Sequence, residues 1–118
     1  MMRGVLSFSA KPGRSDDVES YYRDHAILAR AIAFDGCLNA QLFRAGSTGT
    51  GATHVVMADW ESAADYQNWV DDPWRNEIGT GLLEILECND DSVPVGGLYA
   101  LVLPDVPADS LRTRRYDQ

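Results

Sequence analysis

The sequence predicts an α+β fold in which a four-stranded antiparallel sheet carries helices on one face only. Strand-type alternation and helical periodicity follow one another in two similar halves, residues 3–44 and 53–103, which a glycine-rich stretch joins. This order of elements is that of a ferredoxin-like βαββαβ domain. The chain has 118 residues, and we expect one domain over 1–104 and a polar C-terminal tail over 105–118.

The first half predicts a strand, one long helix and a second strand. Apolar and polar residues alternate along 3–10, as in a strand with two different faces. Ser15 is placed to cap the helix, and apolar residues of 18–33 recur at steps of three and four, so one face of the helix packs. Gly36 follows the end of that helix, and residues 37–44 alternate again.

The second half predicts a strand, two helices and a last strand. The glycine-rich stretch 46–52 predicts a hairpin turn into the strand 53–60, whose apolar run is typical of a strand covered on both faces. A short helix over 63–71 comes next, followed by another over 73–86 with a proline at its first position. After a polar loop, residues 98–103 form the last strand.

Both faces of the predicted sheet are apolar, although helices cover only one of them. In the strands 53–60 and 98–103 each of the two alternating sets of side chains is largely apolar. Soluble proteins rarely leave a large apolar sheet face open to water. We therefore expect a homodimer in which the open face of one copy packs against that of the other.

Composition argues against several classes of function. The chain has 18 acidic and 10 basic residues and a net charge of −8, which is unsuited to a nucleic-acid surface. Its apolar runs are far shorter than the roughly 20 residues that span a bilayer, and its first residues lack a signal peptide's apolar segment. We therefore expect a cytoplasmic protein without membrane partners. Cys37 and Cys88 lack ligand-spaced neighbours, so we expect neither a metal site nor a disulfide.

Several short segments resemble the antibiotic biosynthesis monooxygenase family. They are Asp35-Gly36-Cys37-Leu38, Ala58-Asp59-Trp60-Glu61-Ser62, Asp65-Tyr66 and Asp72-Pro73. Proteins of that family are dimeric α+β barrels, so the resemblance implies that two copies pack their sheets into one barrel. It also implies cofactor-independent oxygenation of electron-rich polycyclic aromatics such as anthrones.

The resemblance carries over to some functional positions of the family and not to others. Trp60 and Tyr66 match a Trp at a strand end and a Tyr six residues later, which contact the substrate in anthrone-oxidising members. Those members also have an Asn four residues before the Trp, where this chain has Val56. They have an Arg in the helix after the Asp-Pro pair, where this chain has Gly79, with Arg75 one turn earlier.

His25 is the candidate general base. It lies beside the apolar stripe of the first helix, one turn from Tyr21 and Tyr22, so its imidazole can point into the space between helix and sheet. The segment Tyr21 to His25 is also similar to the helix-one motif of the EthD-like family. The alternative is a partly exposed histidine bonded to a nearby carboxylate or carbonyl. The other histidine, His54, begins a strand, where we expect it to be solvated.

Aromatic and amide side chains are the candidates for substrate contact. Tyr22, Trp69 and Trp74 could stack a planar ring, although aromatic groups of this kind pack a core more often. Asn39 and Gln41 share one face of a central strand and need hydrogen-bond partners if they are buried. They either shape a ligand cavity or line the interior between the two sheets of a dimer.

The leading hypothesis is a cofactor-independent monooxygenase that oxidises a planar aromatic, polyketide-like substrate with O2, using His25, Trp60 and Tyr66 as catalytic residues. A substrate acidic enough to form a carbanion can pass an electron to O2 itself, so the protein must bind it, take its proton and exclude water. Two alternatives stay open: an EthD-like, cyclase or isomerase enzyme, and a non-catalytic binding or stress-response module. A closed cavity of small-molecule size between helices and sheet, with His25 or an amide pointing into it, favours an enzyme. Complete filling of that space by Trp60 and Tyr66 favours the binding module.

Overall fold

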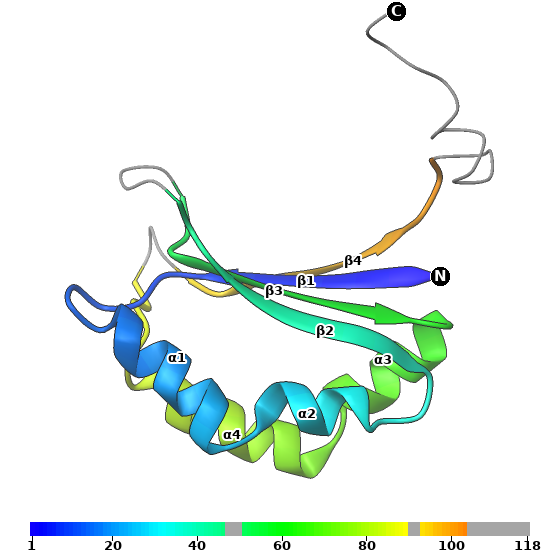
Figure 1. Cartoon of the computed structure of the whole chain (residues 1–118), viewed down its shortest axis with the longest axis horizontal. Coiled ribbons are helices and arrows are strands. Elements are labelled where there is room, and N and C mark those ends of the chain that lie inside the picture. Colours follow the sequence, from blue (N-terminus) through cyan, green and yellow to red (C-terminus); the bar gives the residue numbers. More distant parts are fainter. Residues whose placement is uncertain (47–50, 90–92, 104–118) are drawn as a thin grey trace, which may run out of the picture.

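The computed structural model describes residues 1–46, 51–89 and 93–103. Within these ranges a four-stranded sheet forms one layer and four helices form the other, all on one face of the sheet (Figure 1). The predicted ferredoxin-like α+β fold is confirmed. The predicted tail over 105–118 and the central part of the predicted turn over 46–52 lie outside the described residues, so the domain boundary stays a prediction.

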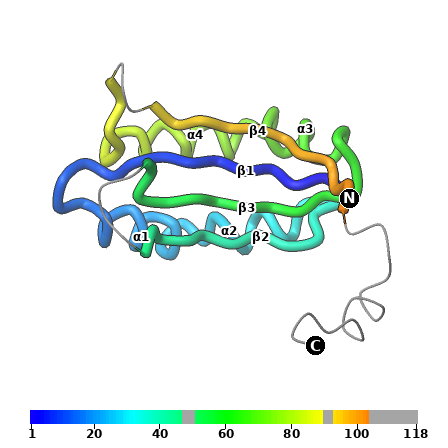
Figure 2. Tube along the Cα trace, turned by 90° about the horizontal axis from the view of Figure 1, so that it is seen from above, coloured from blue at the N-terminus to red at the C-terminus, as the bar shows by residue number. Residues whose placement is uncertain are grey.

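The sheet is antiparallel throughout and has the strand order β2-β3-β1-β4, which Figure 2 shows from above. Its strands are β1 (Met2–Phe8), β2 (Cys37–Arg44), β3 (His54–Trp60) and β4 (Val95–Ala100). β4 begins and ends earlier than the predicted range of 98–103, because its pairing with β1 runs from Val95 opposite Ser7 to Ala100 opposite Met2. The other three strands lie close to their predicted positions.

The long helix predicted over 18–33 is in fact two helices, α1 (Ser15–Asp24) and α2 (Ile27–Ile32). Ala26 separates them with a φ of 51°, a left-handed conformation that costs a non-glycine residue about 1 kcal/mol. The predicted Ser15 cap is also wrong: Ser15 is the first helical residue, and the capping position is Arg14, which makes no side-chain capping bond. Apolar periodicity continues across the break, so it does not reveal either detail.

The two later helices, α3 (Ala63–Val70) and α4 (Pro73–Leu83), begin at side-chain caps. The hydroxyl of Ser62 accepts a hydrogen bond from the backbone N–H of Asp65 at 3.2 Å. The carboxylate of Asp72 accepts one from the N–H of Arg75, also at 3.2 Å. Pro73 occupies the first position of α4 as predicted, although α4 ends before the predicted residue 86. Among the described residues, no helix is long and apolar enough to cross a bilayer.

The core lies between the two layers in two neighbouring clusters. One cluster is built around Phe8, Val18 and Leu86, and the other around Trp60 and Trp69. Trp60 and Val18 are fully buried. The two clusters hold the helices on the sheet at both ends of the cavity that is described below.

In the described part of the chain no helix covers the other face of the sheet (Figure 1). Phe43 and Tyr99 are exposed on this open face, and Met57 near its centre is half-buried. Arg3 donates two hydrogen bonds to the carboxylate of Asp59 across the β1–β3 pair, at 2.7 and 3.0 Å. The open face therefore carries apolar side chains together with an ion pair, so it is less uniformly apolar than predicted, and the homodimer stays a prediction.

Candidate functional site

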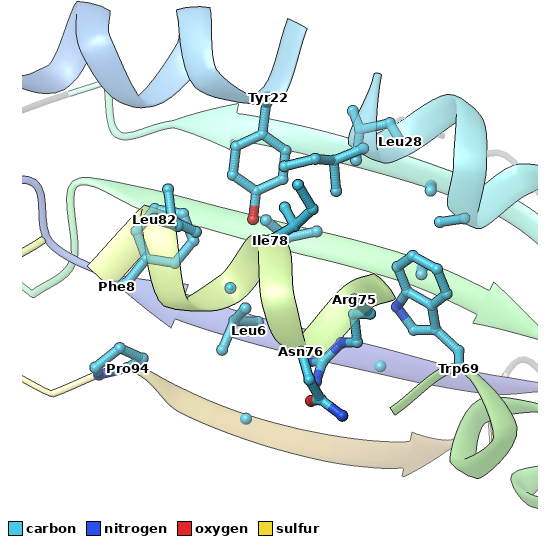
Figure 3. A pocket seen from close by; sticks show the side chains of 18 of the residues that line it. Leu6, Phe8, Tyr22, Leu28, Trp69, Arg75, Asn76, Ile78, Leu82 and Pro94 are labelled. Atoms are coloured by element: carbon cyan, nitrogen blue, oxygen red, sulfur yellow. The ribbon is translucent and has the colours of Figure 1, made fainter. Parts of the chain in front are cut away.

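A cavity of about 370 Å³ lies between the helices and the sheet (Figure 3). Three small residues, Gly4, Ala58 and Ala40, lie opposite one another on β1, β3 and β2 and leave room above the sheet. The volume lies within the range of about 300–1,000 Å³ that is usual for small-molecule sites. The space between helices and sheet is therefore not filled by side chains.

Aromatic side chains form one end of this cavity. Trp60, Tyr66, Trp69 and Trp74 all line it. The ring centroid of Trp60 lies 6.2 Å from that of Tyr66 and 6.4 Å from that of Trp69. The ring of Tyr66 lies against Gly4, since a Cβ atom added there would be 2.8 Å from Cε1 of Tyr66. Glycine at this position therefore lets Tyr66 approach the sheet.

Trp60 combines two roles that the sequence left open, core and cavity wall. Its side chain is fully buried and also lines the cavity. Its Nε1 atom is buried and has no hydrogen-bond partner among the described residues. An orphaned buried donor is uncommon in proteins.

Polar groups also line the cavity, and they come from α1 and α4. Tyr22 reaches in from α1, while Arg75, Asn76 and Thr80 line it from α4 (Figure 3). Burial raises the pKa of the Tyr22 hydroxyl, and the charge of Arg75 opposes this rise. The hydroxyl therefore stays protonated near neutral pH and can donate a hydrogen bond.

His25 lies outside the cavity, so the expectation that its imidazole points between helix and sheet is wrong. The side chain is exposed, its Nδ1 lies 3.0 Å from the carbonyl oxygen of Tyr21, and its ring centroid lies 4.2 Å from that of Tyr21. The cause is the end of α1 at Asp24: His25 is the C-cap residue and does not continue the packed stripe. This is the alternative arrangement, a helix histidine bonded to a carbonyl.

Asn39 and Gln41 do not shape the cavity either, so their prediction as cavity residues is wrong. Both are exposed and lie opposite Asp59 and Met57 on the open face of the sheet. Ala40, between them, faces the helices and lines the cavity. Because side chains alternate along a strand, the two amides must point the other way.

His54 is fully buried, and the expectation that it is solvated is wrong. Its Nε2 lies 2.9 Å from Oε2 of Glu19 and its Nδ1 lies 2.8 Å from Oγ1 of Thr53. The ring also stacks on Phe8, with centroids 5.8 Å apart. The strand period places His54 on the helix-covered face, where α1 closes over it.

Arg75 and Asn76 are cavity residues that the sequence reasoning did not select as site residues. In the sequence, Arg75 lies one turn before Gly79, the position at which anthrone-oxidising members of the family have an Arg. One available signal was the spacing of Arg75, Ile78 and Leu82, which places a cation on the packed face of α4. Among the described residues no group of His, Cys, Asp and Glu side chains could hold a metal ion.

The fold and the cavity define the class of protein: a ferredoxin-like α+β domain with an aromatic, small-molecule-sized cavity between its sheet and helices. The family model described as "Antibiotic biosynthesis monooxygenase" matches residues 1–75, more than half of the chain. The chain therefore belongs to the antibiotic biosynthesis monooxygenase family, as the resemblance predicts. No curated protein sequence gives a significant match.

Solved structures share the fold at low sequence identity. Rv0793 from Mycobacterium tuberculosis is 14% identical, with a TM-score of 0.70, over 89% of this chain and 98% of that one. A mutant form of SnoaB, a cofactor-independent oxygenase from Streptomyces nogalater, is 21% identical, with a TM-score of 0.63, over 88% and 97%. At3g17210 from Arabidopsis thaliana is 19% identical, with a TM-score of 0.70, over 90% and 100%. These similarities support the fold alone.

Proposed function

We propose that this protein is a cofactor-independent monooxygenase that oxidises a planar aromatic, anthrone-type substrate with O2 in the cavity between helices and sheet. The observation that carries the proposal is the unfilled cavity beside Trp60 and Tyr66, the two residues that match substrate-contacting positions of the family. The oxygenase activity named for SnoaB supports the proposal by analogy of fold.

The proposed reaction converts the CH2 group of an anthrone into a carbonyl. The substrate loses a proton and becomes an enolate, which passes an electron to O2. The two radicals combine into a C–O bond, and loss of water gives the quinone. O2 is thereby reduced by four electrons, with one oxygen atom in the product and the other in water, and the substrate is the reductant.

Hydrogen-bond donors that stabilise the enolate oxygen would be the main contribution of the protein. We propose the indole N–H of Trp60, which lacks a partner among the described residues, for this role, with Tyr66 packing against the substrate ring. The described residues that line the cavity include no His, Asp or Glu. We therefore propose that the stabilised enolate forms by proton transfer to water.

The proposed active form is a homodimer. The open sheet face carries Phe43, Met57 and Tyr99, and a second copy packed on it would cover these side chains. Asn39 and Gln41 would then line the interior between the two sheets, the second of the two placements that the sequence allowed. Burial of the open face would also shield the sheet beneath the cavity from water.

Incubation of the protein with anthrone under isotopically labelled O2, followed by mass spectrometry, tests the proposal. We expect the quinone to form faster than in buffer alone and to carry one labelled oxygen atom. Heat-denatured protein is the control for uncatalysed oxidation. A rate equal to that of the control would reject the proposed activity.

A second candidate, binding without catalysis, is favoured by the lack of an ionisable base among the described cavity residues. This reading predicts that anthrone binds in calorimetry and is recovered unchanged beyond the buffer rate. The same incubation therefore distinguishes the two candidates.

A further inference from the structure

Arg75 is the one charged side chain among the described residues that line the cavity. It lies in the first turn of α4, where the helix dipole favours acidic rather than basic side chains. No carboxylate in the described part of the chain forms an ion pair with its guanidinium group. A cation beside apolar walls loses hydration and is best accommodated when an anion joins it.

Tyr22 offers a second unmet donor on the opposite wall. Its side chain is only 7% exposed, and its hydroxyl makes no hydrogen bond with another described residue. Figure 3 shows the ring reaching from α1 towards α4, with the hydroxyl directed into the cavity. The charge of Arg75 opposes the rise of the Tyr22 pKa on burial, so the two groups lie within electrostatic reach of each other.

We infer that the cavity binds a planar aromatic carboxylate, with the ring against Trp60, Tyr66 and Trp69 and the acid group held by Arg75 and the Tyr22 hydroxyl. This inference rests on the proposed function, because it names the substrate class for the same cavity. A carboxylate carries one negative charge and two acceptor oxygens, which match one guanidinium group and one hydroxyl. A phosphate monoester carries nearly two charges at neutral pH, and one of them would stay unpaired here.

Isothermal titration calorimetry with 2-naphthoate and 2-naphthamide tests this inference, because the two probes share a ring system and differ in charge. The wild type is expected to bind the acid at least about tenfold more tightly than the amide, the range of one charge-assisted hydrogen bond. Arg75→Gln should remove most of this preference, because it should weaken binding of the acid far more than binding of the amide. Arg23→Gln is the matched control, since Arg23 is exposed on α1 and does not line the cavity.

Two further variants separate the charge from the shape of the site. Arg75→Lys keeps the positive charge and should keep part of the preference for the acid. Tyr22→Phe should weaken binding of the acid more than binding of the amide. Circular dichroism of each variant identifies any loss of fold, and the wild-type comparison tests the inference without any variant.

Equal affinity of the wild type for both probes would overturn the inference, as would an equal loss of both affinities in folded Arg75→Gln. Either result would leave the cavity as a site for neutral aromatics and the proposed oxygenase intact. Binding of neither probe would also overturn the inference. In that case the anthrone incubation decides separately whether the proposed function survives.

Discussion

The imidazole Nε2 of His54 lies 2.9 Å from the carboxylate Oε2 of Glu19, which joins the start of β3 to α1. The other imidazole nitrogen has Thr53 as its partner, so both nitrogens of a fully buried ring are satisfied. Glu19 also accepts a hydrogen bond from Arg44 at the end of β2. The network thereby fastens α1 onto two neighbouring strands.

His54→Ala should lower the free energy of unfolding by about 3 kcal/mol, because it removes buried packing and leaves its partners unsatisfied. His25→Ala is the matched control, since the side chain is exposed, and its effect should be within about 0.5 kcal/mol. Urea unfolding followed by circular dichroism measures both. Equal effects of the two substitutions would contradict the structural role assigned to His54.

Glu19→Gln should lower stability most near neutral pH. Hydrogen bonds from Arg44, and then from His54, hold the pKa of Glu19 below its ordinary value of 4.5. Because the folded-state pKa is lower than the unfolded one, the ionised carboxylate stabilises the fold above pH 4.5, and this contribution disappears as the pH falls through the folded-state pKa.

The difference in unfolding free energy between wild type and Glu19→Gln, measured in urea over a pH series, checks this prediction. It should shrink steadily as the pH falls below 4.5. Glu77→Gln is the control, since Glu77 is exposed on α4 and has no ion pair among the described residues. A difference for Glu19→Gln that stays constant with pH would contradict the assignment.

Ala26→Gly should stabilise the protein by about 1 kcal/mol, because glycine adopts the left-handed conformation at the junction of α1 and α2 without a Cβ penalty. The control, Ala29→Gly, places glycine within α2 and should destabilise by a similar amount. Thermal unfolding of both variants measures whether each substitution raises or lowers the stability of the protein. Destabilisation by both substitutions would show that Ala26 is not strained.

Met57→Lys should convert a homodimer into monomers, because it places a charge near the centre of the open sheet face. Ile32→Lys is the matched control, since Ile32 is also exposed but lies on α2, in the other layer. In sedimentation velocity at micromolar concentration we expect twice the mass of one chain for the wild type and for Ile32→Lys. A wild type that sediments as a monomer would reject the proposed dimer.

Local signals predicted the architecture well, because each relies on physics within a few residues. The proline that begins α4 acts within one helical turn. The alternation that marks β1 and β2 is likewise a property of neighbouring residues. The apolar pattern did not predict the break at Ala26, because a single left-handed residue changes the direction of a helix without changing the spacing of its apolar residues.

The positions of individual site residues were harder to predict, since they depend on which face of an element meets the other layer. The apolar residues Leu38 and Leu42 favour the set of β2 that contains Ala40 for the helix-covered face. Phe43 in the set that contains Asn39 weakens this local signal. Trp60 was placed by its family match. The spacing of Arg75 with Ile78 and Leu82 indicates the packed face of α4, but its place in the cavity depends on α1 and α4 lying around the same space.

Labelled-oxygen incorporation compared between the wild type and Ala58→Leu tests the central claim most directly. Ala58 lines the floor of the cavity, so leucine there should fill the space and exclude substrate, whereas Ala64→Leu on the exposed side of α3 should not. The account predicts labelled quinone from anthrone for wild type and Ala64→Leu, and only the buffer rate for Ala58→Leu. Equal rates for wild type and buffer, or full activity in folded Ala58→Leu, would contradict it.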